Sequence, residues 1–317
     1  MRTVKSKIVV IGAGKVGSTV AYTLMMNRLV SEIVLIDVDK RRARGEALDI
    51  SHGIAFFQQI TIREGVYEDC VDADIVIITA GIGRKPGQTR IDLARTNVDI
   101  IRSVMQDVLK HKADPLLIII SNPVDILTYL VQKETGLSPS RVIGSGTMLD
   151  TGRFRYLLSE HCRVDVRNVH AYIIGEHGDN SVPIWSQVII ASKPFDKYCE
   201  DSLNCKDTNK ADIYKTVRES GAEIITSKGA TFYGIALATS RIVEAILGDE
   251  NTILPLSTSL YGAYGISDVA LSLPCIVNGK GIDRYLDLHI NEEEQKLLSV
   301  SMEKLSSVIK NILEPKT

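Results

Sequence analysis

Several features that would mark a special class of protein are missing from this chain of 317 residues. Its formal net charge is only −2, so the chain offers no general attraction to nucleic acid or to an acidic membrane. The longest obvious apolar run, Leu116–Ile120, is far too short to span a bilayer. The basic first residues are followed by an apolar run of only Ile8–Ile11, which indicates a strand rather than a secretory signal. These absences predict a soluble, cytoplasmic protein.

The cysteines also lack the patterns that mark a disulfide framework or a metal site. Their number is odd, and no two stand in a CxxC motif or at the spacing of metal ligands. We therefore expect reduced thiols in a reducing compartment and no bound metal. The five cysteines are Cys70, Cys162, Cys199, Cys205 and Cys275.

The first half of the chain alternates short β-branched runs with longer helical patterns. Both faces of these runs are apolar, as in a parallel sheet that helices cover on each side. The alternation predicts a doubly wound α/β domain of the Rossmann type over residues 1–145. The expected strands are residues 7–12, 32–37, 74–81, 116–122 and 141–146, and helical patterns include 16–27 and 39–50.

The second half is less regular and predicts an α+β domain over residues 146–317. One long helical stretch is expected from about Asp212 to Leu247. Near the end, Asn291 and Glu294 have the spacing of a capping box, and apolar residues then recur at helical spacing. This pattern predicts an amphipathic closing helix. No repeat or linker marks the boundary near Gly146, which is placed from pattern alone.

The glycines of GAGKVG follow the first expected strand and open the first helical pattern. Gly12, Gly14 and Gly17 would let the backbone turn tightly and approach a pyrophosphate at the positive end of the helix. A lone GxGxxG is a weak signal, but Asp37 ends the second strand 20 residues beyond Gly17. A carboxylate there accepts hydrogen bonds from ribose hydroxyls and repels the extra phosphate of NADP. We therefore interpret Asp37 as part of an NAD site rather than as an ordinary turn residue.

A basic loop lies within Gly81–Arg95. It carries Arg84, Lys85 and Arg90 around a Pro86–Gly87 turn. Such a loop is typical of a lid that closes on an anionic substrate, and the alternative is a solvated basic loop without a ligand.

Three further residues become informative when they are taken together. His177 stands among glycines in a loop after an expected strand, and Asp150 and Arg153 have the spacing of one helical face. Taken separately, they would be a surface histidine and a local ion pair. Together with Arg90, they supply the groups that hydride transfer to a 2-keto acid requires.

Each of these four residues has an expected role. Arg153 would bind the substrate carboxylate through two hydrogen bonds, and His177 would donate a proton to the forming alkoxide. Asp150, bonded to the other ring nitrogen, would raise the pKa of His177. Arg90 would polarise the ketone as the lid closes and excludes water.

Over essentially its whole length, the chain resembles the L-lactate dehydrogenases of the lactate/malate dehydrogenase family. The resemblance implies that Asn122 positions substrate and nicotinamide, that Ser145 contacts the carboxamide end, and that Thr231 lines the substrate pocket. Thr231 could instead be a packed helical residue. The matching segments are IGAGKVG, ITAG, KPGQTRIDL, SNPVD, GSGTMLDTGRFR, IIGEHGD and KGATFYGIA.

The same resemblance extends the NAD site and implies an assembly. Further cofactor contacts are expected from Val16 in the glycine motif and from Thr79, Ala80 and Gly81 in ITAG. Family members associate, so a dimer or a tetramer is expected. A relative that kept the fold and lost the chemistry should have lost at least one of the four catalytic groups, and this chain has all of them.

The lid departs from the bacterial lactate pattern QKPGETR, because this chain has RKPGQTR. In the malate branch, an arginine at the position of Arg84 binds a second carboxylate, and Gln88 removes a negative charge from the loop. A charged hydrogen bond to oxaloacetate contributes about 1.5–3 kcal/mol. Pyruvate would leave Arg84 unpaired, at a cost of about another 1–3 kcal/mol. This predicts roughly a hundredfold preference for oxaloacetate over pyruvate.

Other residues favour an ordinary L-lactate dehydrogenase. Glu176, Trp185 and Thr231 are of the lactate type, and Arg84 would not discriminate between the two keto acids if it pointed to solvent.

The resemblance also implies an effector site, because Arg155 and His170 match positions that bind fructose 1,6-bisphosphate between subunits in allosteric bacterial relatives. The alternative is that these two residues pair with nearby acids such as Glu160 and Asp165.

Overall fold

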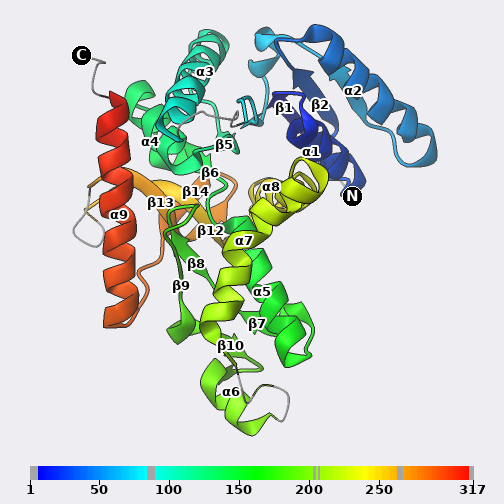
Figure 1. Cartoon of the computed structure of the whole chain (residues 1–317). Helices are drawn as coiled ribbons and strands as arrows, with labels where there is room; N and C mark the ends of the chain where they lie inside the picture. Colours follow the sequence, from blue (N-terminus) through cyan, green and yellow to red (C-terminus); the bar gives the residue numbers. More distant parts are fainter. Residues whose placement is uncertain (1–5, 84–89, 203–204, 206–207, 263–266, 314–317) are drawn as a thin grey trace.

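A computed structural model describes residues 6–83, 90–202, 205, 208–262 and 267–313, except for the side chains of residues 90 and 261. Figure 1 shows β1, β2, α1 and α2 at the upper right, α3 and α4 at the upper left, and α6 at the lower end. Helix α9 (Glu292–Leu313) runs along one side of the molecule. Among the described residues, no helix is both long and apolar enough to cross a membrane.

The strands of the first half form a parallel sheet in the order β3–β2–β1–β4–β5–β6. This order is the one that dinucleotide-binding doubly wound sheets adopt. The strands are β1 (Lys7–Ile11), β2 (Glu32–Ile36), β3 (Thr61–Glu64), β4 (Ile75–Ile78), β5 (Leu117–Ile119) and β6 (Val142–Gly144). The predicted Rossmann fold is therefore confirmed.

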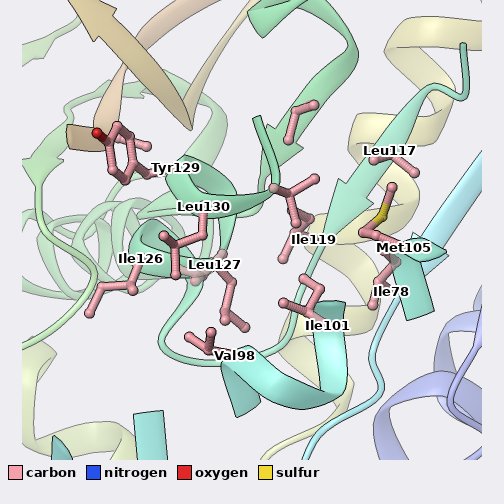
Figure 2. Close-up of a cluster of buried hydrophobic side chains, with 14 of the residues drawn as sticks. Ile78, Val98, Ile101, Met105, Leu117, Ile119, Ile126, Leu127, Tyr129 and Leu130 are labelled. Atoms are coloured by element: carbon pink, nitrogen blue, oxygen red, sulfur yellow. The ribbon is translucent and has the colours of Figure 1, made fainter. Parts of the chain in front are cut away.

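Helices cover both faces of this sheet because successive strand residues point to opposite sides. Ile8 and Val10 of β1 join a core that includes α1 and α2, whereas Val9 and Ile11 join a core that includes α3 and α4. Figure 2 shows the second core, where Val98 and other apolar side chains of α3 face those of α4. The helices are α1 (Lys15–Met26), α2 (Lys40–His52), α3 (Arg90–His111) and α4 (Val124–Thr135).

Antiparallel strands of the second half continue the same sheet in the order β12–β13–β8–β9. Strand β12 pairs with β6, so one sheet carries residues from both halves of the chain. A separate small sheet contains β11, β10 and β7. The strands are β7 (Val169–His170), β8 (Ile173–Gly175), β9 (Ser181–Pro183), β10 (Ile189–Ile190), β11 (Lys193–Pro194), β12 (Thr252–Tyr261), β13 (Ser267–Asn278) and β14 (Gly281–Tyr285).

The expected long helix from Asp212 to Leu247 is two helices, so this prediction was wrong. Helix α7 (Lys210–Lys228) ends at Gly229, whose φ of +86° is left-handed, and α8 (Tyr233–Leu247) begins as a separate helix. The remaining helices of this half are α5 (Met148–Cys162) and α6 (Phe195–Asp201).

The predicted capping box of the closing helix is present. Asn291 Oδ1 accepts from the Glu294 N–H at 2.9 Å, and Glu294 Oε2 accepts from the Asn291 N–H at 3.1 Å. The apolar residues of α9 that recur at helical spacing are buried against β8, β9 and β13. The amphipathic helix is therefore confirmed.

The expectation of five reduced thiols is wrong for one pair, because Cys199 and Cys205 form a disulfide in the structure. Helix α6 ends at Asp201, and the chain turns back so that the two Cα atoms lie 4.6 Å apart. Cys70, Cys162 and Cys275 are free and buried.

Candidate active site

The turn between β1 and α1 has the geometry that the glycine motif predicts. Gly12 has a φ of +103°, and a Cβ at Gly17 would overlap the Gly12 carbonyl oxygen and come within 2.8 Å of Thr79 Oγ1. A Cβ at Gly14, in contrast, would meet nothing within 4 Å. Gly12 and Gly17 are therefore needed for close packing, whereas Gly14 leaves open space at the N-terminus of a helix of 12 residues. An anion fits such a space.

The Asp37 carboxylate lies beside this turn. Its Oδ2 accepts a hydrogen bond from the Ala13 N–H at 2.7 Å, and its Oδ1 accepts one from the Asp39 N–H at 2.9 Å. The side chain is half-buried and keeps lone pairs that ribose hydroxyls can use. An open anion-binding helix end and an adjacent carboxylate together fit the pyrophosphate and ribose of NAD.

The ends of β4 and β5 form the neighbouring part of the same sheet edge. The Thr79 hydroxyl donates to the Gly12 carbonyl at 2.8 Å, and the Ser121 hydroxyl donates to the Ala80 carbonyl at 2.6 Å. Buried Asn97 donates to the Asn122 carbonyl at 2.7 Å and accepts from the Ile82 N–H at 2.9 Å. Asn97 was not predicted from the sequence, because an amide in the middle of a helical pattern carries no motif.

The remaining expected cofactor residues occupy different environments. Val16 is half-buried and packs against the core of α1 and α2. Gly81 and Asn122 are exposed, and Ser145 is buried directly after β6, where its N–H donates to the Ile119 carbonyl at 2.9 Å. Gly81, Asn122 and Ser145 follow β4, β5 and β6, so they stand at the edge where parallel sheets bind their ligands.

The structure brings His177, Asp150 and Arg153 together. His177 Nδ1 lies 2.6 Å from Asp150 Oδ2, and Arg153 Nη1 donates to Asp150 Oδ1 at 3.1 Å. Asp150 lies in the first turn of α5, where the helix dipole stabilises a negative charge. One buried carboxylate therefore holds two cationic groups, one with each of its oxygens.

The charges of this group determine the protonation of the imidazole. Burial alone would lower the pKa of His177, but the Asp150 carboxylate outweighs burial and raises that pKa to about 9. Burial likewise opposes the charge on Asp150, but His177 and Arg153 together hold the pKa of Asp150 below its usual value. The free ring nitrogen, Nε2, is then a proton donor at neutral pH.

Asp125 is a second carboxylate beneath the histidine loop. It is buried, and its Oδ2 accepts from the His177 backbone N–H at 2.7 Å. Its Oδ1 has no hydrogen-bond partner among the described residues, and burial raises the pKa of Asp125 to about 6. Its role was not predicted from the sequence, although it stands in the SNPVD segment. Its contact with the backbone positions His177 independently of Asp150.

The structure describes the other expected substrate residues only in part. Thr231 is half-buried in the segment between α7 and α8, outside either helix. Arg90 is the first residue of α3, but its side chain lies outside the described residues, and so does the whole of Arg84. Their roles stay predictions.

Two family models match nearly the whole chain. The NAD-binding domain of lactate/malate dehydrogenase matches residues 6–144, and the α/β C-terminal domain of the same family matches residues 147–315. The chain belongs to the lactate/malate dehydrogenase family. It is therefore an NAD-dependent oxidoreductase, and its NAD-binding domain is the α/β half described above.

Named relatives are similar over nearly their full lengths. An L-lactate dehydrogenase of Acetivibrio thermocellus is 50% identical over 307 residues, which are 96% of this chain and 97% of the relative. The structure of a minor L-lactate dehydrogenase from Enterococcus mundtii, with ligands bound, has a TM-score of 0.93 at 41% identity. That match covers 98% of this chain and 99% of the other. A lactate dehydrogenase from a deep-sea metagenome library gives the same TM-score and coverage at 42% identity.

The two glycine environments predict different effects of the same substitution. We expect Gly17→Ala to lower the melting temperature, because its Cβ has no room. Gly14→Ala should leave the melting temperature nearly unchanged but weaken NADH binding at least about tenfold, because its Cβ enters the space for the phosphates. Differential scanning fluorimetry and a fluorescence titration with NADH measure the two effects. Equal melting temperatures for the two variants would contradict the different roles of the two glycines.

The Asp150–His177 pair predicts the pH dependence of reduction. Only protonated His177 donates a proton, so kcat/KM for keto-acid reduction should fall as the pH rises through about 9. Asp150→Asn removes the charge that raises the pKa and should move this fall down by at least about one pH unit. Asp165→Asn, at an acid paired with Arg167 away from the site, is the control and should leave the profile unchanged.

The pair also links stability to pH. Because the folded pKa of His177 is raised, its stabilising contribution is complete below its ordinary pKa of 6.5 and is lost as the pH rises through about 9. Asp150→Asn should remove this loss from the free energy of unfolding. If kcat/KM for keto-acid reduction fell at the same pH in Asp150→Asn as in wild type, Asp150 would not be the group that sets the pKa of His177.

Proposed function

We propose that this chain catalyses the reversible reduction of pyruvate to L-lactate by NADH. The observation that carries the proposal is the arrangement of His177 and Arg153 on the two oxygens of Asp150. The names of similar relatives, one of them 50% identical to this chain, support lactate as the hydroxy acid. The lactate-type residues Glu176 and Trp185 agree with this choice.

The residues of the chain divide the work as follows. Arg153 of α5 binds the carboxylate of the keto acid. Helix α7 packs against α5 and forms the other side of this carboxylate site. His177 Nε2 donates its proton to the substrate oxygen as that oxygen gains negative charge, and takes the proton back in the oxidative direction. Asp150 keeps the ring in the orientation that leaves Nε2 free. NADH, when bound, supplies the hydride.

A second candidate substrate is oxaloacetate, and the residue that favours it is Arg84. This arginine replaces the glutamine of the lactate pattern and could pair with a second carboxylate. The relatives named L-lactate dehydrogenase favour pyruvate instead. The two proposals differ in one measurable quantity, which is the ratio of kcat/KM for the two keto acids.

Steady-state kinetics with both keto acids test the choice. If pyruvate is the substrate, wild type should have a higher kcat/KM for pyruvate than for oxaloacetate. If Arg84 selects oxaloacetate, kcat/KM should be roughly a hundredfold higher for oxaloacetate than for pyruvate. Arg84→Gln should then restore the preference for pyruvate. Lys85→Gln removes the same charge from the same loop and is the matched control. A similar shift in both variants would show a general effect of loop charge.

Self-association is part of the proposal, because apolar side chains are exposed on neighbouring helices. Tyr22 and Met26 of α1 are 50% and 42% exposed, and Tyr233 and Leu237 of α8 are 65% and 59% exposed. Helices α1 and α8 lie side by side (Figure 1). A surface of this kind is typical of an interface with a second copy. We also propose the cytoplasmic location that the sequence predicts.

We propose that fructose 1,6-bisphosphate binds between such copies at Arg155 and His170. His170 is exposed, and the Arg155 Nε donates to the Ala171 carbonyl at 2.9 Å. The nearby acid Asp165 is bonded to Arg167 instead. Arg155 is therefore bonded to a backbone carbonyl rather than to Asp165, and the exposed His170 is accessible to an anion.

Kinetics and light scattering test this effector site. The bisphosphate should lower the apparent KM for the keto acid at least about threefold or raise the molar mass, since a ligand shared by two subunits favours their association. His170→Ala should abolish the response, whereas His52→Ala, at another exposed histidine, should keep it. No effect of the bisphosphate on wild type in either measurement would remove the proposal.

A further inference from the structure

Three cysteine sulfur atoms meet in the lower part of the molecule, away from the dinucleotide turn. Cys162 ends α5, Cys199 lies in α6, and Cys205 lies in the segment before α7. Their sulfur atoms all lie within 4.8 Å of one another, and Cys162 Sγ is 3.1 Å from Cys205 Sγ. The three side chains are 2%, 8% and 1% exposed. Among the described residues, this is the one group with the composition and closeness of a metal site.

A histidine stands next to this cluster. The His161 Nε2 lies 2.6 Å from Thr208 Oγ1, and that hydroxyl lies 3.8 Å from Cys199 Sγ. The Thr208 hydroxyl also donates to the Cys205 carbonyl at 2.8 Å. The Thr208 hydroxyl therefore stands between the His161 imidazole and the Cys199 sulfur. Three thiols and an imidazole form a donor set that zinc prefers in structural sites.

A cavity of about 440 Å³ adjoins the cluster. Cys199, Cys205 and Thr208 line it together with Lys210, whose ammonium group lies 5.5 Å from the centre of the Trp185 ring. Asp196 and Glu200 line the cavity as well, and the Lys210 ammonium is paired with Asp196 Oδ1 at 2.6 Å. The cavity also leaves room for small movements of the sulfur atoms.

A disulfide alone does not account for the position of the third sulfur. The Cys199–Cys205 bond uses two sulfurs and leaves the Cys162 thiol buried against one of them. A thiophilic cation can bind all three sulfur atoms. It would also cross-link α5, the short helix α6 and the segment before α7, where the apolar core is small.

We propose that the reduced chain binds one zinc ion through Cys162, Cys199 and Cys205, and that His161 becomes the fourth ligand when its ring leaves the Thr208 hydroxyl. A dithiol reductant supplies two electrons and two protons to the Cys199–Cys205 bond and becomes a disulfide itself. Three thiols then release three protons when they bind the ion. Three thiolates, one neutral imidazole and Zn²⁺ leave a net charge of −1.

Metal analysis of the full chain tests the proposal. The protein is reduced with a dithiol, the dithiol and any chelator are then removed by gel filtration without oxygen, the chain is loaded with Zn²⁺ and dialysed, and its zinc is measured by mass spectrometry. We expect about one equivalent per chain in wild type and less than about a tenth in Cys162→Ser. His161→Ala should bind zinc at least about tenfold more weakly. Cys70→Ser, at a buried cysteine outside the cluster, is the matched control and should keep the metal.

Cobalt provides a readout that needs no variant. A titration of reduced wild type with Co²⁺ should produce the intense near-ultraviolet absorption of thiolate-to-cobalt charge transfer, and Zn²⁺ should abolish it. Absence of this band, or equal zinc in wild type and Cys162→Ser, would overturn the proposal. A Cys199–Cys205 bond that persists in reductant with no metal bound would also overturn it. These outcomes are independent of catalysis, because no activity is measured.

Discussion

The Asp150 carboxylate is the group on which the arrangement of the active site depends. A buried carboxylate without partners would lose its charge, because burial favours the protonated form. Here each oxygen has a cationic partner, His177 or Arg153, and the pKa of Asp150 is lowered instead. The same interaction raises the pKa of His177. One side chain thus fixes the positions of two cations and the protonation of one of them.

The continuous sheet places this group beside the NAD-binding half. Strand β6 pairs in parallel with β5 and in antiparallel with β12, through Gly144 and Ser257. The junction is close: a Cβ at Gly146 would lie 2.7 Å from the Ser257 nitrogen. Only glycine fits there, and the chain passes directly from Ser145 at the sheet edge into α5. Sheet pairing therefore sets the relation between the expected cofactor contacts and Asp150.

The sequence predicted those elements whose signals are local. Strong apolar runs marked β1, β2, β4, β5 and β6, but not β3, whose sequence TIRE is polar because it forms the edge of the sheet. The capping box at Asn291 and Glu294 was recognisable because both partners lie within one helical turn. The break at Gly229 was missed because the helical periodicity on both sides concealed a single left-handed residue.

Short motifs by themselves indicated which residue types the chemistry needs: the glycines, Asp37, Asp150, Arg153 and His177. Their spacing reflects backbone geometry over a few residues, so it can be read without a fold. Tertiary structure alone decided that His177 shares the carboxylate of Asp150, that Asp125 supports the histidine backbone, and that three distant cysteines meet. Such contacts depend on chain reversals between residues far apart in sequence, and no local pattern encodes the distance between them.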